Sequence, residues 1–284
     1  MKKILIFSLA LCAAALSCGC SSTNSESSDN GSVAEQSSSQ TETVSSESEE
    51  TEEEAESSES EAAEGDSEAE GEYTLLADFS QGPSEDFYSS DGWSNGLPFN
   101  CSWIASNCVF EDGVLKMSIN EAEDGSYTGA EHRTNEMYGY GLYEVSMKPA
   151  KNVGIISSFF TYTGPTDGNP LDEIDIEFLG KDTTQVQFNY YTNGSAEGHE
   201  YLYDLGFDAS EDFHTYGFRW EEDKITWYVD GEAVYEATED IPTTPGRIMM
   251  NVWNGIGVDD WIGAYDGTTP LTAEYQWVRF TAEE

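Results

Sequence analysis

The chain has 284 residues, with 56 aspartates and glutamates against 11 lysines and arginines, a formal net charge of −45 and a pI of about 4.1. This charge excludes nucleic acid and anionic membrane surfaces as binding partners, because both require clustered cations. Of the 13 Phe, 7 Trp and 16 Tyr residues, all but Phe7 lie at or beyond Tyr73. Only the stretch 73–284 can therefore bury a large core, and its length suits one β-sandwich or barrel domain.

The first 20 residues have the composition of a bacterial export signal. Lys2 and Lys3 precede the apolar run Ile4–Leu16, which is too short to span a bilayer permanently. A cysteine directly after such a run resembles a lipoprotein processing site, so we expect Cys20, or alternatively Cys18, to carry a lipid. An ordinary secretory peptide with incidental cysteines is the other interpretation. We expect an exported bacterial protein that is either secreted or held at the cell surface by a lipid anchor alone.

Residues 21–72 predict a disordered linker. They contain 18 acidic residues and no basic or aromatic residue. Low hydrophobicity and a single sign of charge leave nothing to offset chain entropy. We expect this Ser/Glu-rich segment to act as a tether or solubilising spacer ahead of one catalytic domain at 73–284.

From Tyr73 onward the sequence is typical of an all-β fold. Turn signals recur about every 8–12 residues, and no stretch keeps the spacing of an amphipathic helix for three turns. Glu111–Gly113 predicts a hairpin turn, and Asp230-Gly231 follows another predicted strand. The predicted strands include Cys108–Phe110, Val114–Ile119, Gly141–Lys148, Gln185–Tyr191, Ile225–Val229 and Tyr275–Phe280. The pattern predicts a β-sandwich.

The segment Asp172–Phe178 alternates strictly between acidic and apolar side chains. On a strand, Glu173, Asp175 and Glu177 would share one face, while the apolar residues would pack into the core. Three carboxylates in a row repel each other and are unfavourable to bury, so the acidic face must be open. An acidic strand edge without catalysis gives the same alternation. The 7 tryptophans, with Asn and Tyr in the same strands, favour a sugar-binding groove.

Paired carboxylates about 5–5.5 Å apart are the signature of a retaining glycosidase. On a flat strand, Glu173 and Glu177 would be about 13 Å apart at roughly 3.3 Å per residue. The hypothesis therefore requires a concave sheet at this point. Asp175, between them, is expected to raise the pKa of a neighbouring glutamic acid by like-charge repulsion.

At this motif the chain resembles glycoside hydrolase family 16, and within it the bacterial lichenases, which are endo-β-1,3-1,4-glucanases. The unbulged Glu-x-Asp-x-Glu form is the one that lichenases carry. The resemblance extends from about Asp78 to Phe280 and rests on the blocks Gly92–Gly96, Tyr138–Ala150, Ser157–Pro165, Asp172–Thr184, Val186–Gly194, Ile248–Gly255 and Gly257–Trp261.

The resemblance implies a jelly-roll β-sandwich with a glucan cleft across its concave sheet. Glu173 would be the nucleophile, Asp175 an electrostatic helper and Glu177 the acid/base. The residues that would line the cleft are Asn95, Glu131, Arg133, Phe160, Tyr162, Asn189, Tyr191, Asn251, Trp253 and Trp261. Core packing is the alternative for the aromatic residues, and a plain ion pair is the alternative for Arg133.

Three positions depart from the family pattern. Leu171 stands where lichenases place a tryptophan that borders the cleaved bond. The family disulfide joins the positions of Cys101 and Gly129, so that bridge cannot form, and Cys108 is the candidate replacement partner. Gln276 stands where the family's calcium site has an aspartate, which weakens a hard-cation site. A structural calcium ion stays an open alternative, and we expect no required cofactor or other metal.

The function that the resemblance implies is retaining endo-hydrolysis of β-1,4 bonds adjacent to β-1,3 linkages in mixed-linkage β-glucan, by a monomer. The alternative enzyme is a xyloglucan hydrolase or transglycosylase of the same family, which would need a wider cleft. The alternative from another class is a non-catalytic glucan-binding surface lipoprotein, which would not need Glu173 and Glu177 together.

Overall fold

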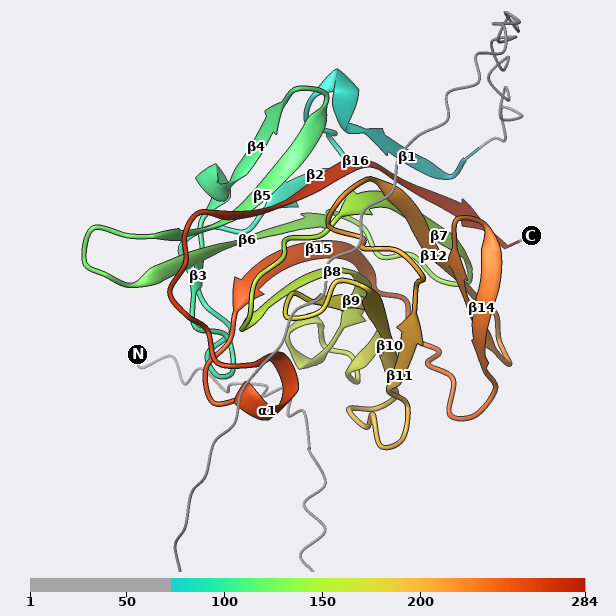
Figure 1. Ribbon diagram of the computed structural model, residues 1–284. Coiled ribbons are helices and arrows are strands. Elements are labelled where there is room, and N and C mark those ends of the chain that lie inside the picture. Colours follow the sequence, from blue (N-terminus) through green and yellow to red (C-terminus); the bar gives the residue numbers. More distant parts are fainter. Residues whose placement is uncertain (1–72, 284) are drawn as a thin grey trace, which may run out of the picture. The chain divides into compact units, whose positions relative to one another are not determined.

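The computed structural model describes residues 73–283. The expected signal peptide (1–20), with Cys18 and Cys20, and the expected linker (21–72) lie outside the described residues, so these assignments stay predictions. Within 73–283, no helix is long and apolar enough to cross a membrane. The described part consists mainly of β-strands arranged in two packed layers (Figure 1).

The first layer is an antiparallel sheet that carries the candidate site. Its strand order is β11 (Tyr201–Asp204), β10 (Gln185–Tyr191), β9 (Asp172–Leu179), β8 (Ile155–Thr163), β15 (Arg247–Asn254) and β6 (Tyr127–Thr134), with β2 (Phe87–Ser89) also paired to β6. Figure 1 shows β15, β8, β9 and β10 side by side. In register, Glu177 on β9 lies between Ser158 on β8 and Gln187 on β10.

The second layer packs behind the first. Its strand order is β4 (Cys108–Glu111), β5 (Val114–Glu121), β16 (Leu271–Ala282), β7 (Gly141–Lys148), β12 (His214–Trp220), β13 (Ile225–Val229) and β14 (Glu232–Ala237), with β1 (Leu75–Asp78) paired to β16. The layers are joined where β5 pairs with β6, at Asn120 opposite Thr128. The short elements are β3 (Ser102–Trp103), η1 (Phe79–Gln81), η2 (Ala105–Asn107), η3 (Pro165–Asp167) and α1 (Asp259–Ile262).

The core between the layers is aromatic. Phe178 on β9 packs against Tyr216 on β12, with ring centroids 4.9 Å apart. Phe188 on β10 stacks on Trp227 of β13 at 5.6 Å, and all four side chains are fully buried. Each buried aromatic side chain contributes about 1.5–3 kcal/mol through removal from water. This packing fixes the core-facing side chains of β9 and β10. The alternate side chains of both strands must therefore point away from the core.

The tryptophans are divided between the core and the site, contrary to the expectation that they serve a sugar-binding groove together. Trp103, Trp220 and Trp227 are fully buried. Trp277 on β16 of the second layer lies against the Arg279 guanidinium at 4.6 Å. The remaining three are near the acidic strand and are described below. Tryptophan content alone could not separate these roles, because a core and a sugar platform use the same apolar ring.

The predicted strands are confirmed, and three of them (β7, β10 and β13) have the predicted bounds. Two hairpins also follow the sequence signal. Asp112 and Gly113, with φ of 55° and 79°, connect β4 to β5. Asp230 and Gly231, with φ of 48° and 80°, connect β13 to β14. Positive φ at both central residues matches the twist of a two-residue hairpin turn, which explains the Asp-Gly pairs.

Candidate active site

Strand β9 presents its acidic row to a pocket and its apolar row to the core. Ile174, Ile176 and Phe178 are 0% exposed. Glu173, Asp175 and Glu177 line one pocket of about 430 Å³, which we call the main pocket. Residues i, i+2 and i+4 of one strand therefore face a common space, as the sequence hypothesis requires.

The main pocket contains most of the predicted cleft residues. Those that line it are Asn95, Glu131, Arg133, Phe160, Tyr162, Asn251 and Trp253. Tyr191 and Trp261 line an adjoining side pocket of about 60 Å³, to which Glu173, Asp175 and Glu177 also contribute. The side chains come from β6, β8, β10, β15, α1 and the loop before β3, so the fold brings together residues far apart in sequence.

Asn189 is the predicted cleft residue that lines neither pocket. It lies opposite Asp175 in the strand register and is 2% exposed. Its Oδ1 accepts a hydrogen bond from the backbone N–H of Tyr190 at 2.9 Å. By its pairing with Asp175, Asn189 lies on the pocket face of β10 beside the acidic row, although it lines neither pocket, and its role as a substrate contact stays a prediction.

Leu171 also lies outside both pocket linings. Its backbone carbonyl accepts a hydrogen bond from Gly194 N at 2.8 Å, so the residue is tied to the turn at 193–194. It is two residues before Glu173, on the pocket face by the period-two rule.

Sequence reasoning missed several residues of the main pocket wall. Trp93, Ser94, Leu97 and Phe99 lie in the loop before β3, and Thr166 lies in η3. Ser158 and Met249 belong to strands whose other pocket residues were predicted. Period-two alternation from Phe160 and from Asn251 would have found these two, whereas the loop residues carry no periodic signal.

The two glutamates have different surroundings. Burial raises the pKa of Glu177, and the negative charges of Glu173 and Glu200 raise it further. Burial also raises the pKa of Glu173, but a side-chain hydrogen bond between Glu173 and Asp175 opposes this. For Glu173 the expectation is wrong, because Asp175 lowers the pKa of this residue, whereas an effect of Asp175 on Glu177 stays a prediction. Because a hydrogen bond to the charged form favours it, Asp175 helps Glu173 to stay ionised.

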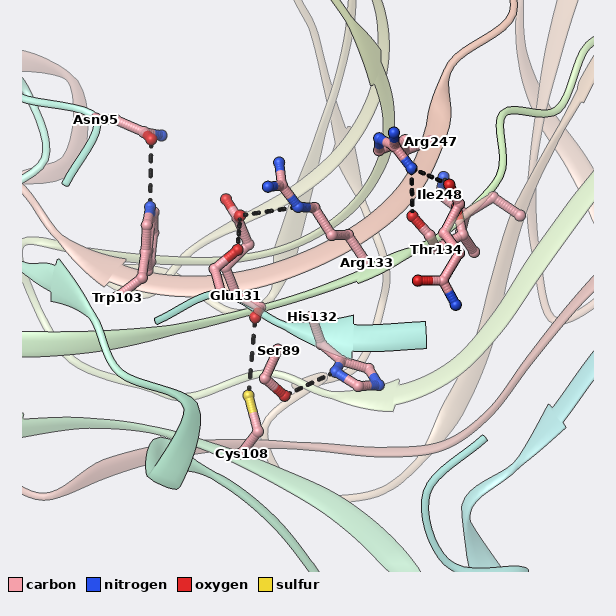
Figure 2. Close-up of polar contacts among 12 residues, drawn as sticks. Ser89, Asn95, Trp103, Cys108, Glu131, His132, Arg133, Thr134, Arg247 and Ile248 are labelled. Atoms are coloured by element: carbon pink, nitrogen blue, oxygen red, sulfur yellow. Dashed lines mark hydrogen bonds and ion pairs between the residues drawn. The ribbon is translucent and has the colours of Figure 1, made fainter. Parts of the chain in front are cut away.

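A fourth carboxylate of the main pocket, Glu131 on β6, lies beside Arg133 (Figure 2). The Ser90 hydroxyl donates to Glu131 Oε1 at 2.5 Å, and Arg133 Nε lies 3.8 Å from the same oxygen. The guanidinium also lies over the rings of Tyr88, at 5.0 Å, and Trp93, at 5.4 Å. Burial raises the pKa of Glu131, and the Ser90 and Arg133 contacts counteract it. Arg133 is thus both an ion-pair partner and a pocket residue.

The expected Cys101–Cys108 disulfide is absent, because both residues are buried free thiols. Cys101 packs with Trp103 and Trp253 beside the pocket. Cys108 belongs to the separate core between the layers, where its thiol points to the Glu131 carbonyl at 3.9 Å. Sequence separation could not reveal that two cysteines so near in the chain lie in different clusters.

The part of the chain that the structure describes has no group of three or more His, Cys, Asp or Glu arranged to hold a metal. At the position relevant to calcium, Gln276 Oε1 accepts a hydrogen bond from the Ser146 hydroxyl at 2.8 Å. A neutral amide oxygen engaged in this way is a poor substitute for a carboxylate ligand. Calcium binding itself stays a prediction to be tested.

Comparison with known proteins agrees with this geometry. The family model described as glycosyl hydrolases family 16 matches residues 95–279. The chain belongs to this family. It is 61% identical to a beta-glucanase of Paenibacillus macerans over 194 residues, which cover 68% of this chain and 81% of that protein. It is 60% identical to a xylanase/beta-glucanase of Ruminococcus flavefaciens over 215 residues, 73% of this chain but only 27% of that protein.

Family 16 membership also settles the fold. The structure of a prokaryotic beta-1,3-1,4-glucanase (lichenase) from a mouse hindgut metagenome aligns with a TM-score of 0.71 and 58% identity, covering 74% of this chain and 99% of that one. A Bacillus licheniformis beta-glucanase aligns with a TM-score of 0.72, 55% identity and coverage of 74% and 98%. The predicted jelly-roll sandwich is confirmed.

Proposed function

We propose that the chain is a retaining endo-β-1,3-1,4-glucanase that cleaves β-1,4 bonds adjacent to β-1,3 linkages in mixed-linkage β-glucan. The observation that carries the proposal is the convergence of Glu173, Asp175 and Glu177 on one pocket. The names of the similar proteins, beta-glucanase and lichenase, support the substrate. That the protein acts as a monomer stays a prediction.

The electrostatics divide the roles between the two glutamates. Glu173, whose pKa is lowered by its hydrogen bond with Asp175, is the nucleophile, because it is the easier of the two to keep ionised. Glu177, whose pKa is raised by burial and by the Glu173 charge, keeps its proton and is the acid. Two carboxyl groups whose environments give them different pKa values are usually assigned these two roles.

Cleavage then follows two balanced steps. A Glu173 carboxylate oxygen bonds to the anomeric carbon as the glycosidic C–O bond breaks, and Glu177 gives its proton to the departing oxygen. Water next attacks the anomeric carbon, Glu177 takes up the water proton, and the bond to Glu173 breaks. The product keeps its configuration because the carbon is attacked twice.

The pocket walls suit a glucose chain. Trp93, Phe160, Tyr162 and Trp253 offer flat rings, and Asn95 and Asn251 offer amides for hydroxyl groups. Trp261 adds a ring in the side pocket. Ser158 donates to Asn251 Oδ1 at 2.6 Å, which leaves the Asn251 NH₂ group to donate to a sugar oxygen.

The test is hydrolysis of barley β-glucan, laminarin, xyloglucan and carboxymethylcellulose, compared by reducing-sugar release. We expect barley β-glucan to be cleaved fastest. Proton NMR of fresh products should show the β anomer first. Faster cleavage of xyloglucan would favour the alternative enzyme, absence of any cleavage would favour a binding protein, and initial release of the α anomer would contradict the two-step mechanism.

We also propose that the protein is exported and anchored through a lipid on Cys20 or Cys18. The support is the charged, apolar and small-residue order of residues 2–20, together with the acidic character of residues 21–72. One lipidated cysteine would be the anchor. Replacement of both cysteines by alanine should move the protein from the detergent phase to the aqueous phase, and unchanged partitioning would contradict the anchor.

A further inference from the structure

A buried glutamine connects a pocket tryptophan to the catalytic acid. Trp261 Nε1 donates a hydrogen bond to Gln187 Oε1 at 3.0 Å. Gln187 Nε2 in turn donates to Glu177 Oε2 at 2.9 Å. Gln187 is 6% exposed and lines neither pocket. It therefore lies behind the wall that substrate would contact.

The chemistry of the indole determines how this amide is turned. An indole N–H can only donate, so the oxygen of Gln187 must face Trp261. The NH₂ group is then left to face Glu177, which can always accept on a carboxyl oxygen. If the amide turned over, its NH₂ group would meet the indole N–H, and both contacts would be lost.

The backbone holds both ends of this connection. Gln187 is paired with Glu177 across β10 and β9, so the two side chains emerge next to each other on the pocket face. Trp261 lies on α1, where its backbone N–H donates to Val258 O at 3.0 Å. Its own carbonyl accepts a hydrogen bond from Lys181.

We propose that Gln187 is a positioning residue for the acid/base: held in one orientation by Trp261, its amide donates to Glu177 and sets the upper pH limit of catalysis. This rests on the proposed function of Glu177. A donated hydrogen bond is stronger to a carboxylate than to a carboxylic acid, so it favours the ionised form. Gln187 thus limits how firmly the acid keeps its proton, and it makes the return of that proton in the second step easier.

The other groups around Glu177 act in the opposite direction or are neutral. Burial, Glu173 and Glu200 favour the protonated form, and Gln187 is the contact that opposes them. The charged and titratable groups that line the two pockets with Glu177 are Glu173 and Asp175 on β9, Glu131 and Arg133 on β6, Tyr162 on β8 and Tyr191 on β10. Glu200, before β11, acts on Glu177 through its charge. The neighbour of Glu177 on β8 is the neutral Ser158.

The test is the pH dependence of kcat/KM on barley β-glucan, whose basic limb reports the acid of the free enzyme. Gln187→Leu removes both hydrogen bonds, and we expect the basic limb to move upward by about one pH unit. Gln187→Glu adds a negative charge and should move it upward at least as far. Trp261→Phe keeps a ring but loses the N–H, and should give a smaller shift in the same direction.

Gln185→Leu is the matched control. Gln185 lies on the same strand and face as Gln187, but its amide donates to Asp204 at 2.5 Å and not to Glu177. The basic limb of the pH profile of Gln185→Leu should coincide with that of the wild type. The proposal is overturned if Gln187→Leu lowers the rate but leaves the basic limb unmoved, or moves it downward. If that variant does not fold, an unmoved limb in both Gln187→Glu and Trp261→Phe overturns it equally.

A second measurement separates this inference from the proposed function. Carbon-13 NMR titration of the Glu177 carboxyl requires no turnover. An upward shift of its midpoint in Gln187→Leu supports the contact even if barley β-glucan is not the substrate. An unchanged midpoint in a protein that does cleave barley β-glucan overturns the inference alone.

Discussion

The two faces of the first sheet treat ionisable side chains in opposite ways. On the pocket face, Glu131 receives a hydrogen bond from Ser90, and Glu177 receives one from Gln187. On the core face, His132 of β6 has one nitrogen near the Ser89 hydroxyl at 2.9 Å, while its Nε2 has no hydrogen-bond partner (Figure 2). Its ring stacks on Phe87 at 5.2 Å.

This difference shows what distinguishes a functional buried group from a structural one. A carboxyl group near the pocket has a hydrogen-bond donor that favours its ionised form, so it can both lose and regain a proton. The histidine is surrounded by rings, and burial lowers its pKa to about 4. It is therefore held neutral and acts as an aromatic core residue. Adjacent positions of β6, such as Glu131 and His132, fall on different sides of this division because the strand period is two.

The largest expected effect concerns the pocket face of β9. Glu173→Gln and Glu177→Gln should each lower kcat on barley β-glucan by roughly 10²–10⁴-fold, because each removes charge or a transferable proton and keeps the shape. The melting temperature should stay near that of the wild type. A variant that retains more than about a tenth of the rate would exclude that glutamate from the role assigned here.

The opposite face of the same strand should respond in stability instead. Ile176, between Asp175 and Glu177 in sequence, is 0% exposed in the core. Ile176→Ala should therefore lower the free energy of unfolding by about 2–5 kcal/mol. Ile176→Val, which removes one methylene, should cost about 0.5–1.5 kcal/mol. Urea unfolding measures both. If folded Ile176→Val lost activity as severely as the glutamate variants, the two faces would not be separable.

The core face also predicts a pH dependence through His132. Its folded pKa of about 4 lies below the ordinary value of 6.5, so the unfolded chain takes up the proton first. The free energy of unfolding should therefore fall as pH drops from about 6.5 to about 4, by up to about 3 kcal/mol. His132→Phe should lack this component. Equal slopes in urea unfolding of both proteins across that range would contradict a neutral buried histidine.

The smallest expected effect tests the edge of the pocket. Leu171→Trp places a longer, flat side chain on the pocket face next to Glu173, where it can contact a glucose ring. We expect this contact to add about 0.5–1.5 kcal/mol of binding free energy, or roughly a two- to tenfold gain in kcat/KM. Leu171→Phe should give an intermediate gain. No gain at an unchanged melting temperature would show that position 171 serves the turn at 193–194 alone.

The sequence was a good guide wherever strand periodicity carries the information. Alternation in β9 predicted that Glu173, Asp175 and Glu177 share the open face and that Ile174 and Ile176 are buried. It could not predict which side chains would meet across strands and loops. The contact between Trp261 and Gln187 requires α1 to lie beside β10, and sequence spacing does not specify this placement.

The same limit explains the other differences between prediction and structure. Trp227 and Trp253 both stand on strands, yet one packs between the layers and the other lines the main pocket. Cys101 and Cys108 are separated by β3 and η2, which direct them into different clusters. In each case the outcome depends on which layer the residue joins, and that is decided by long-range pairing.

The pairing of β16 has a consequence for the order in which the protein can assemble. This strand, the last of those in residues 73–283, lies inside the second layer between β5 and β7, and it also pairs with β1, the first of them. During synthesis, the middle of that layer stays open until β16 has emerged, and Leu75 can pair with Phe280 only then. A chain shortened to end before residue 271 would therefore lack β16, which is a central strand of the second layer and not an edge strand. We expect such a truncated chain to remain unfolded, as a late, long-range closure of this kind makes folding slow and all-or-none.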